Sequence, residues 1–171
     1  MYHASLKVRN CVYGQSWRVE VGVMEFFPYT KAYKDACLAL FDANCPQYFA
    51  ENERADYAQF LDAVPGGYRV GVINDVVTAA YGMRVDEMKV RARIVWIMVA
   101  PSSAGSGVGT EMMNNAKSSA VEAGAPVIDI AASHLSAPFF AKHGAVVLTE
   151  TQDGWGQGMH RVDMELALPS G

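Results

Sequence analysis

A continuous apolar run spans residues 94–99, Ile-Val-Trp-Ile-Met-Val, and is rich in β-branched and aromatic side chains. Such a run predicts a strand buried on both faces, which Pro101 ends because proline cannot donate to a β-ladder. A loop of small residues follows at 102–109. Beyond the loop, apolar residues recur with the spacing of a helix and therefore predict one. They are Val108, Met112, Met113, Ala116 and Val121.

Upstream of this run the pattern predicts one strand, two helices and a hairpin. Alternating valines indicate a strand at 17–26, which Phe27-Pro28-Tyr29 should end. Thr30 is placed to cap a first helix, whose apolar stripe is Tyr33, Cys37, Leu38, Phe41 and Cys45. A second, shorter helix should bury Tyr57, Phe60, Leu61 and Val64, and strands at 68–73 and 76–83 flank a turn at 74–75.

Downstream, the pattern predicts a buried strand at 127–131 and a short helix at 139–143, which Gly144 ends. Two further strands are expected at 145–151 and 159–168, joined by residues 153–158. The order is therefore one strand, two helices, three strands, a helix, a strand, a helix and two strands. We expect a single domain at 17–171, preceded by an N-terminal extension at 1–16 that shows no clear period.

Composition excludes several classes of protein. The chain has no run near 18 apolar residues and its first residues lack the apolar core of a signal peptide, so we expect no membrane span or membrane partner. A net charge of -4 argues against a broad nucleic-acid surface. The cysteine count, 3, is odd, which does not suggest a disulfide scaffold. Cys37 and Cys45 should lie about 12 Å apart on one helix, which is too far for a disulfide bond. A reducing, cytoplasmic location follows.

The glycine-rich loop at 102–109 stands between a predicted strand and a predicted helix, where free N–H groups can hold a phosphate. A Walker loop would need a lysine after Gly109, which is followed instead by Thr110 and Glu111. The dinucleotide fingerprint fits Gly105 and Gly107 but meets Thr110 in its third glycine position. The same glycines would also suit a tight turn that binds nothing.

The loop resembles the acetyl-CoA pyrophosphate loop of the GNAT family of N-acetyltransferases, Q/R-x-x-G-x-G/A, with Ala104 in place of the usual Gln or Arg. Residues 139–145, FFAKHGA, are similar to the family's F-Y-x-x-x-G-F segment. The turn at 134–140, the D-G-x-G-x-G loop at 153–158 and the D-M-E-L strand at 163–166 resemble bacterial members of unassigned substrate. The likeness runs from about residue 26 to 168, and the order of elements is also that of the family.

The resemblance implies an α+β fold with α/β/α layers: a mixed, mostly antiparallel sheet of about seven strands, with helices on both faces and a splay between strands 4 and 5. It implies that acetyl-CoA binds as co-substrate along the fourth strand, the glycine loop and the short helix. The residues implied are Met98, Val99, Ala104, Gly105, Ser106, Gly107, Val108, Gly109, Thr110, Ser133, Ser136, Phe139 and Phe140.

The implied reaction is direct attack by a primary amine of a small molecule or peptide on the acetyl carbonyl, in a ternary complex. His134 is the leading candidate for the catalytic base, since an imidazole titrates near neutrality; the alternative is that it caps the short helix. Phe140 replaces the tyrosine that protonates the thiolate in many relatives, and Asp129 is expected to be a hydrogen-bonded structural acid. The aromatic residues Tyr29, Tyr48, Phe49 and Trp96 could line an acceptor pocket or fill the core.

No grouping of His, Cys, Asp and Glu has metal-ligand spacing, so we expect no metal. Two other functions stay open: an acetyl-CoA or acyl-CoA sensor without turnover, and an acyltransferase that uses another acyl-CoA or a hydroxyl acceptor. The patterns leave monomer and homodimer both open.

Overall fold

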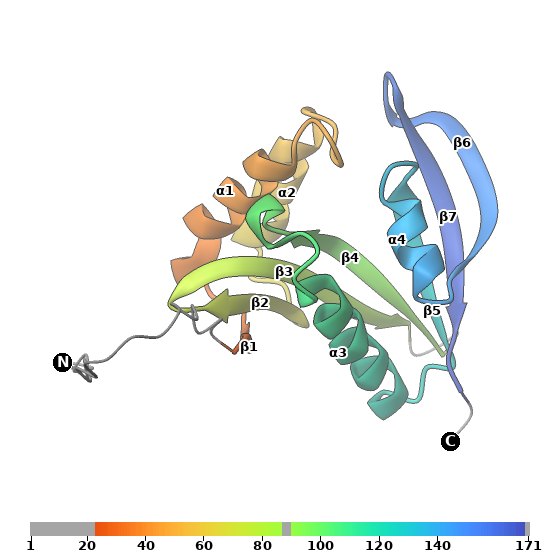
Figure 1. Ribbon diagram of the computed structural model, residues 1–171, viewed down its shortest axis with the longest axis horizontal. Coiled ribbons are helices and arrows are strands. Elements are labelled where there is room, and N and C mark those ends of the chain that lie inside the picture. Colours follow the sequence, from red (N-terminus) through yellow and green to blue (C-terminus); the bar gives the residue numbers. More distant parts are fainter. Residues whose placement is uncertain (1–22, 87–89, 170–171) are drawn as a thin grey trace, which may run out of the picture.

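The computed structural model describes residues 23–86 and 90–169, and its centre is one seven-stranded sheet in the order β1-β2-β3-β4-β5-β7-β6 (Figure 1). Only the central β4–β5 pair is parallel; every other pair is antiparallel. The strands are β1 (Glu25–Pro28), β2 (Tyr68–Ile73), β3 (Val76–Asp86), β4 (Arg91–Val99), β5 (Val127–Ser133), β6 (Val146–Gly156) and β7 (Met159–Ala167).

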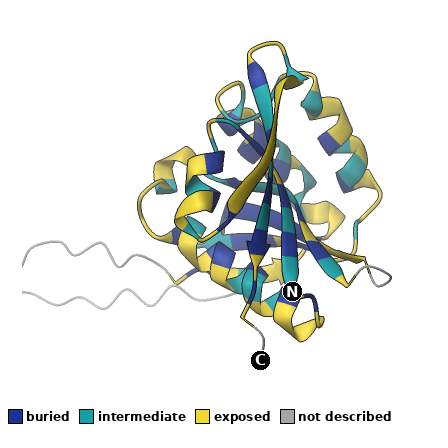
Figure 2. Ribbon diagram, turned by 90° about the vertical axis from the view of Figure 1, so that its right-hand side faces the viewer, coloured by how far each residue is buried: buried dark blue, intermediate teal, exposed yellow. Residues whose placement is uncertain are grey.

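Helices cover both faces of this sheet, as expected from the sequence. They are η1 (Lys31–Tyr33), α1 (Lys34–Asn44), α2 (Glu53–Asp62), η2 (Pro101–Ser103), α3 (Val108–Glu122) and α4 (Ala137–Lys142). One core contains the buried apolar residues of α3 and α4, and a second core contains those of α1 and α2. In β3, Ala79 and Tyr81 belong to the first core and Ala80 to the second, because successive side chains of a strand point to opposite faces. Figure 2 shows buried residues along the strands and on the inner sides of the helices.

A β-bulge in β4 interrupts this alternation. Val95 lies opposite Gly82 and Met98 opposite Ala80, so Trp96 and Ile97 both face the single residue between them on β3. Trp96 has a φ of +48°, which a bulky residue rarely adopts. The extra residue reverses the faces, since Ile94 lies in the first core and Met98 in the second although their numbers have the same parity.

The central strands are joined only at one end. β4 and β5 pair at Ala92 with Ile128 and at Arg93 with Asp129, and no further pair joins these two described strands to each other. Beyond these pairs the strands diverge, as Figure 1 shows. The splay predicted between the fourth and fifth strands is therefore present.

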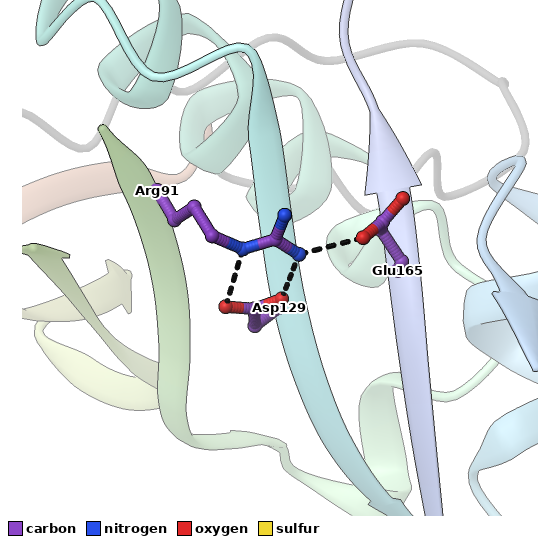
Figure 3. Close-up of polar contacts among 3 residues, drawn as sticks. All are labelled: Arg91, Asp129 and Glu165. Atoms are coloured by element: carbon purple, nitrogen blue, oxygen red, sulfur yellow. Dashed lines mark hydrogen bonds and ion pairs between the residues drawn. The ribbon is translucent and has the colours of Figure 1, made fainter. Parts of the chain in front are cut away.

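Arg91 closes the paired end of this splay (Figure 3). Its Nε donates to Asp129 Oδ2 at 3.1 Å, and its Nη2 donates to Glu165 Oε2 at 2.6 Å, so one guanidinium ties β4 to β5 and β7. Asp129 and Glu165 are direct cross-strand neighbours, and without a cation between them two like charges would face each other. The expectation that Asp129 is a hydrogen-bonded structural acid is confirmed.

Replacing Arg91 with Met should lower the free energy of unfolding by about 1–2 kcal/mol, between the values for exposed and buried ion pairs. For a chain of this size that is a fall of about 3–6 °C in Tm, measured by thermal unfolding. Arg54→Met is the matched control, because Arg54 makes a similar two-bond contact to Asp42 on the surface. Equal shifts in the two variants would contradict a special role for Arg91.

Three sequence predictions near the start of the described chain were wrong in detail. The first strand is Glu25–Pro28, so Phe27 and Pro28 belong to it; β1 is an edge strand, where a proline costs no ladder hydrogen bond on its free side. Thr30 makes no side-chain cap, and a 3₁₀ turn begins there instead. α2 ends at Asp62, and Val64 is exposed at a φ of +46°.

Two further sequence predictions concern segments rather than single residues, and the structure tests only the second. The part of the first predicted strand before residue 23, and the expected extension at 1–16, lie outside the described residues. The connecting segment at 153–158 is mostly strand, since β6 continues to Gly156 with a change of register after Thr151. In the described residues no helix is long and apolar enough to cross a bilayer.

Candidate acyl-CoA site

The loop from β4 to α3 is held by two glycines with left-handed backbone angles. Gly105 has a φ of +78°, and Gly107, at the N-cap of α3, has a φ of +93°. Residues other than glycine adopt such positive φ angles only at an energetic cost. The preceding turn is closed by Ser106, whose N–H and Oγ both donate to Ser103 O, at 3.2 and 2.7 Å. These backbone angles and hydrogen bonds together fix the conformation of the main chain before α3.

This conformation leaves several N–H groups free at the N-terminus of α3. The first helical hydrogen bond is that of Glu111 N–H to Gly107 O, at 3.0 Å. In the described structure the N–H groups of Val108, Gly109 and Thr110 have no backbone acceptor, and neither do those of the two left-handed glycines. With the helix dipole, this arrangement suits a phosphate.

Two of the N–H groups predicted to hold the pyrophosphate are already used. Ala104 N–H donates to Pro101 O at 3.1 Å, and Ser106 N–H is bonded as described above. These two N–H groups stabilise turns within the loop and are not available to a ligand. The donors left from the predicted set are those of Gly105 and of residues 107–110.

The edge of β4 that faces the splay is set by its pairing with β3. Ala100 N–H donates to Thr78 O at 2.7 Å, so by alternation the backbone groups of Val99 point to the opposite edge, toward the splay. Met98 is paired with Ala80, so its backbone groups point to β3. Of the two predicted pantetheine partners, this pairing leaves Val99 as the one that faces the gap.

Asn44, at the end of α1, was not identified from the sequence and reaches this edge. Its side chain is buried, and Nδ2 donates to Leu40 O at 2.9 Å and to Val99 O at 3.0 Å. The amide thus fixes the Val99 carbonyl and leaves the Val99 N–H for a ligand. The only hint in the sequence was a polar residue in an otherwise apolar stripe.

The opposite wall of the splay is formed by the start of α4. Ser133 and Ser136 bond each other: their hydroxyls are 3.0 Å apart, and each backbone N–H lies within 3.2 Å of the other's Oγ. Phe139 reaches the first turn of α3, where a Cβ on Gly109 would lie 2.9 Å from its ring. Phe140 is 3% exposed and lies in the first core, so the aromatic residue at the loop is Phe139.

A model of the family described as "Acetyltransferase (GNAT) family" matches residues 37–145, which is more than half of the chain. The chain belongs to the GNAT family of acetyltransferases. The matched range runs from α1 to the end of α4 and includes the bulge, the loop and the splay. A search among curated proteins returns no match.

Solved structures with the same GNAT fold are similar over nearly their whole length. They include the Escherichia coli ribosomal-protein-S18-alanine N-acetyltransferase (11% identity, TM-score 0.70), which covers 87% of this chain and is itself covered to 96%. Salmonella typhimurium yncA, solved with its cofactor acetyl-CoA, shows 16% identity, a TM-score of 0.66 and coverages of 87% and 96%. An aminoglycoside 6'-N-acetyltransferase complexed with coenzyme A shows 12% identity, a TM-score of 0.68 and coverages of 87% and 99%. At these identities the likeness shows the GNAT fold.

His134, the predicted base, lies after β5 beside a second histidine that sequence reasoning did not connect with it. His160 N–H donates to His134 Nδ1 at 3.2 Å, His134 N–H donates to His160 O at 3.0 Å, and the rings are 4.7 Å apart. An Nδ1 that accepts a hydrogen bond places the proton of a neutral imidazole on Nε2, which then donates. His134 would have to give up this bond to act as a base.

A cleft of about 390 Å³ lies at the mouth of the splay, between the loop after α1 and the β6–β7 hairpin. Its lining is Pro46, Ala50, Glu51, Asn52, Leu135, Gly156, Gln157, Gly158 and Met159. Glu53 orders the loop, since Oε2 accepts Ala50 N–H at 2.7 Å and burial raises the pKa of its carboxyl. The four aromatic residues weighed for an acceptor pocket do not line this cleft; Tyr29, Phe49 and Trp96 pack in the second core.

Proposed function

We propose that the protein transfers the acetyl group of acetyl-CoA to a primary amine of a small molecule or peptide. The observation that supports this most directly is the position of the free N–H groups of Gly107 to Thr110, at the open end of the splay between β4 and β5. One extended ligand with a pyrophosphate at one end and a thioester at the other fits both features. The yncA and aminoglycoside acetyltransferase structures were solved with acetyl-CoA and coenzyme A, which agrees with this proposal.

In this proposal the pyrophosphate accepts hydrogen bonds from Gly105 and from residues 107–110, and pantetheine lies along the gap-side edge of β4. Val99 N–H donates to it, while Asn44 keeps the Val99 carbonyl occupied. The phosphates gain charge-assisted hydrogen bonds from the helix N-terminus, and no lysine or arginine is needed for them. Phe139 packs on Gly109 and closes the gap beside the pantetheine.

The reaction needs a neutral amine at the acetyl carbon. The nitrogen forms a C–N bond, the resulting oxyanion accepts a backbone N–H of β4, and the C–S bond then breaks to release the CoA thiolate. One proton of the amine passes to solvent, and a thiolate with a pKa near that of cysteine, about 8.5, leaves without an obligatory acid. The cleft beside Glu51 is where we place the acceptor, because a carboxylate attracts an ammonium group.

The variant His134→Gln distinguishes a catalytic base at this position from a purely structural histidine. Because His134 Nδ1 accepts a backbone N–H, we expect the variant to lose about 1 kcal/mol of stability, as for a lost cap, and to keep the acidic limb of the pH–rate profile. Thermal unfolding and the pH dependence of kcat/KM measure the two effects. A loss of that limb with a fall in turnover of about 10²-fold would instead establish His134 as the base.

The function is tested by incubating the protein with acetyl-CoA and a panel of primary amines, peptides with free N-termini and alcohols, and measuring free thiol over time. We expect thiol release that depends on an amine and is absent with alcohols of matched size. Acetyl-CoA binding without release under any acceptor would favour a sensor. Faster release from a longer acyl-CoA or with an alcohol would favour a different acyltransferase.

A further inference from the structure

A chain of buried polar groups runs through the second core to the bulge of β4. Tyr68 Oη lies 3.0 Å from the carbonyl oxygen of Trp96 and 2.7 Å from Tyr57 Oη. The Tyr57 hydroxyl also contacts the Cys37 thiol, and all three side chains are at most 2% exposed. Most polar atoms buried to this extent in folded proteins are hydrogen-bonded.

The direction of these hydrogen bonds follows from the groups themselves. A carbonyl can only accept, so Tyr68 O–H donates to Trp96 O, and since a hydroxyl has one proton, Tyr57 O–H must donate to Tyr68 Oη. Burial raises the pKa of both tyrosines, which keeps both protons in place at neutral pH. Tyr68 is therefore a fixed donor to the bulge.

The fold makes room for this contact. Tyr68 of β2 lies opposite Gly82 of β3, and a Cβ on Gly82 would lie 2.8 Å from the Tyr68 ring and 2.6 Å from Val95. Only a glycine lets the tyrosine pass over β3 and reach β4. The contacted residue, Trp96, is the one with the left-handed φ, three positions beyond Arg93, where β4 last pairs with β5.

Holding the Trp96 carbonyl also orients the next N–H group. The C=O of Trp96 and the N–H of Ile97 belong to one planar trans peptide, so they point in opposite directions. Tyr68 holds the oxygen on the α1–α2 side, and the Ile97 N–H accordingly points away from that side. The bulge stands where the splay opens, which is where the acyl end of a thioester would lie if its phosphates are at the start of α3.

We propose that Tyr68 is a positioning residue for acyl transfer, which acts by aiming the Ile97 N–H at the thioester carbonyl through its hydrogen bond to Trp96 O. This inference rests on the proposed function. Tyr68 does not touch the substrate, and its removal should change turnover more than acetyl-CoA binding, because the phosphate-binding N–H groups lie elsewhere. An aimed N–H stabilises the oxyanion, and a small misplacement of it raises the barrier.

The test is Tyr68→Phe, which keeps the ring and removes the hydroxyl. We expect kcat to fall about 10-fold while the Kd of acetyl-CoA stays within about 2-fold of the wild-type value. Tyr29→Phe is the matched control: Tyr29 packs against Tyr68 in the same core, and its buried hydroxyl has no hydrogen-bond partner in the described structure. Tyr29→Phe should leave both quantities unchanged, and Tyr57→Phe should have an intermediate effect on kcat.

A second readout does not require turnover. In ¹⁵N NMR spectra, acetyl-CoA should shift the Ile97 amide resonance of the wild type and of Tyr29→Phe, and the shift should be much smaller in Tyr68→Phe. Equal kcat and equal Ile97 shifts in Tyr68→Phe and Tyr29→Phe would overturn the inference. If no amine is acetylated by the wild type, the proposed function fails, and the Ile97 shift alone then decides whether Tyr68 aims this N–H at a bound thioester.

Discussion

Replacing Gly107 with Asp should weaken acetyl-CoA binding by about 100-fold or more, since like charges in contact cost several kcal/mol. Gly107 is the N-cap of α3, and a carboxylate there would stand against the pyrophosphate and accept the N–H groups meant for it. Space is not the obstacle, because a Cβ at this position meets nothing within 4 Å. Isothermal titration with acetyl-CoA measures the loss.

The control for this variant is Gly124→Asp, at the other end of the same helix. Gly124 also has a left-handed φ, +72°, and open space around its Cα, so the two substitutions impose similar backbone strain. Gly124→Asp should bind acetyl-CoA as the wild type does. A folded Gly107→Asp variant with unchanged affinity would contradict the placement of the phosphates.

Titration of Cys37 alone should lower the free energy of unfolding by about 2 kcal/mol as the pH rises from 9 to 11. Burial raises the pKa of the Cys37 thiol from its usual 9.0 to about 11, so over this range the unfolded chain loses a proton that the folded protein keeps. The stabilising effect is complete below pH 9 and is lost as the pH approaches the folded value. Burial also raises the pKa of Tyr57 and Tyr68 above the usual 10, so these tyrosines add to the fall from about pH 10 upward and extend the decline to higher pH. Urea unfolding in reducing buffer measures it.

Cys37→Ala should make the stability curve less steep between pH 9 and 10, although the variant is less stable at neutral pH. Cys45→Ala is the control: burial also raises the pKa of this thiol, but Cys45 is only half-buried, so its removal should change the slope less than the removal of Cys37 does. Equal slopes for wild type and Cys37→Ala would show that the thiol titrates normally in the folded protein.

The parts of the fold that depend on local patterns could be predicted from the sequence. The apolar run of β4, the glycine loop and the stripe of α3 each determine one element through neighbours a few residues away. Their order was enough to indicate the family and the splay. Pro28 was misread because its tolerance depends on β1 being an edge strand, which only the assembled sheet determines.

The finer features of the site depend on residues distant in sequence. The bulge at Trp96 is held by Tyr68, and the Val99 carbonyl is held by Asn44, 55 residues before it. His134 suited a base by its position after β5, but its Nδ1 is occupied by the N–H of His160, 26 residues later. No local period encodes such contacts, because each needs two elements to pack before it can form.

The central claim is that this chain moves an acetyl group from acetyl-CoA to an amine, and the direct measurement is a paired count of products in one reaction. Free CoA thiol and N-acetylated amine, quantified together by absorbance and mass spectrometry, should appear in equal amounts, only when amine is present, and should be lost in Gly107→Asp. Thiol release at the same rate with and without amine, or acetylated amine formed equally by Gly107→Asp, would contradict the account.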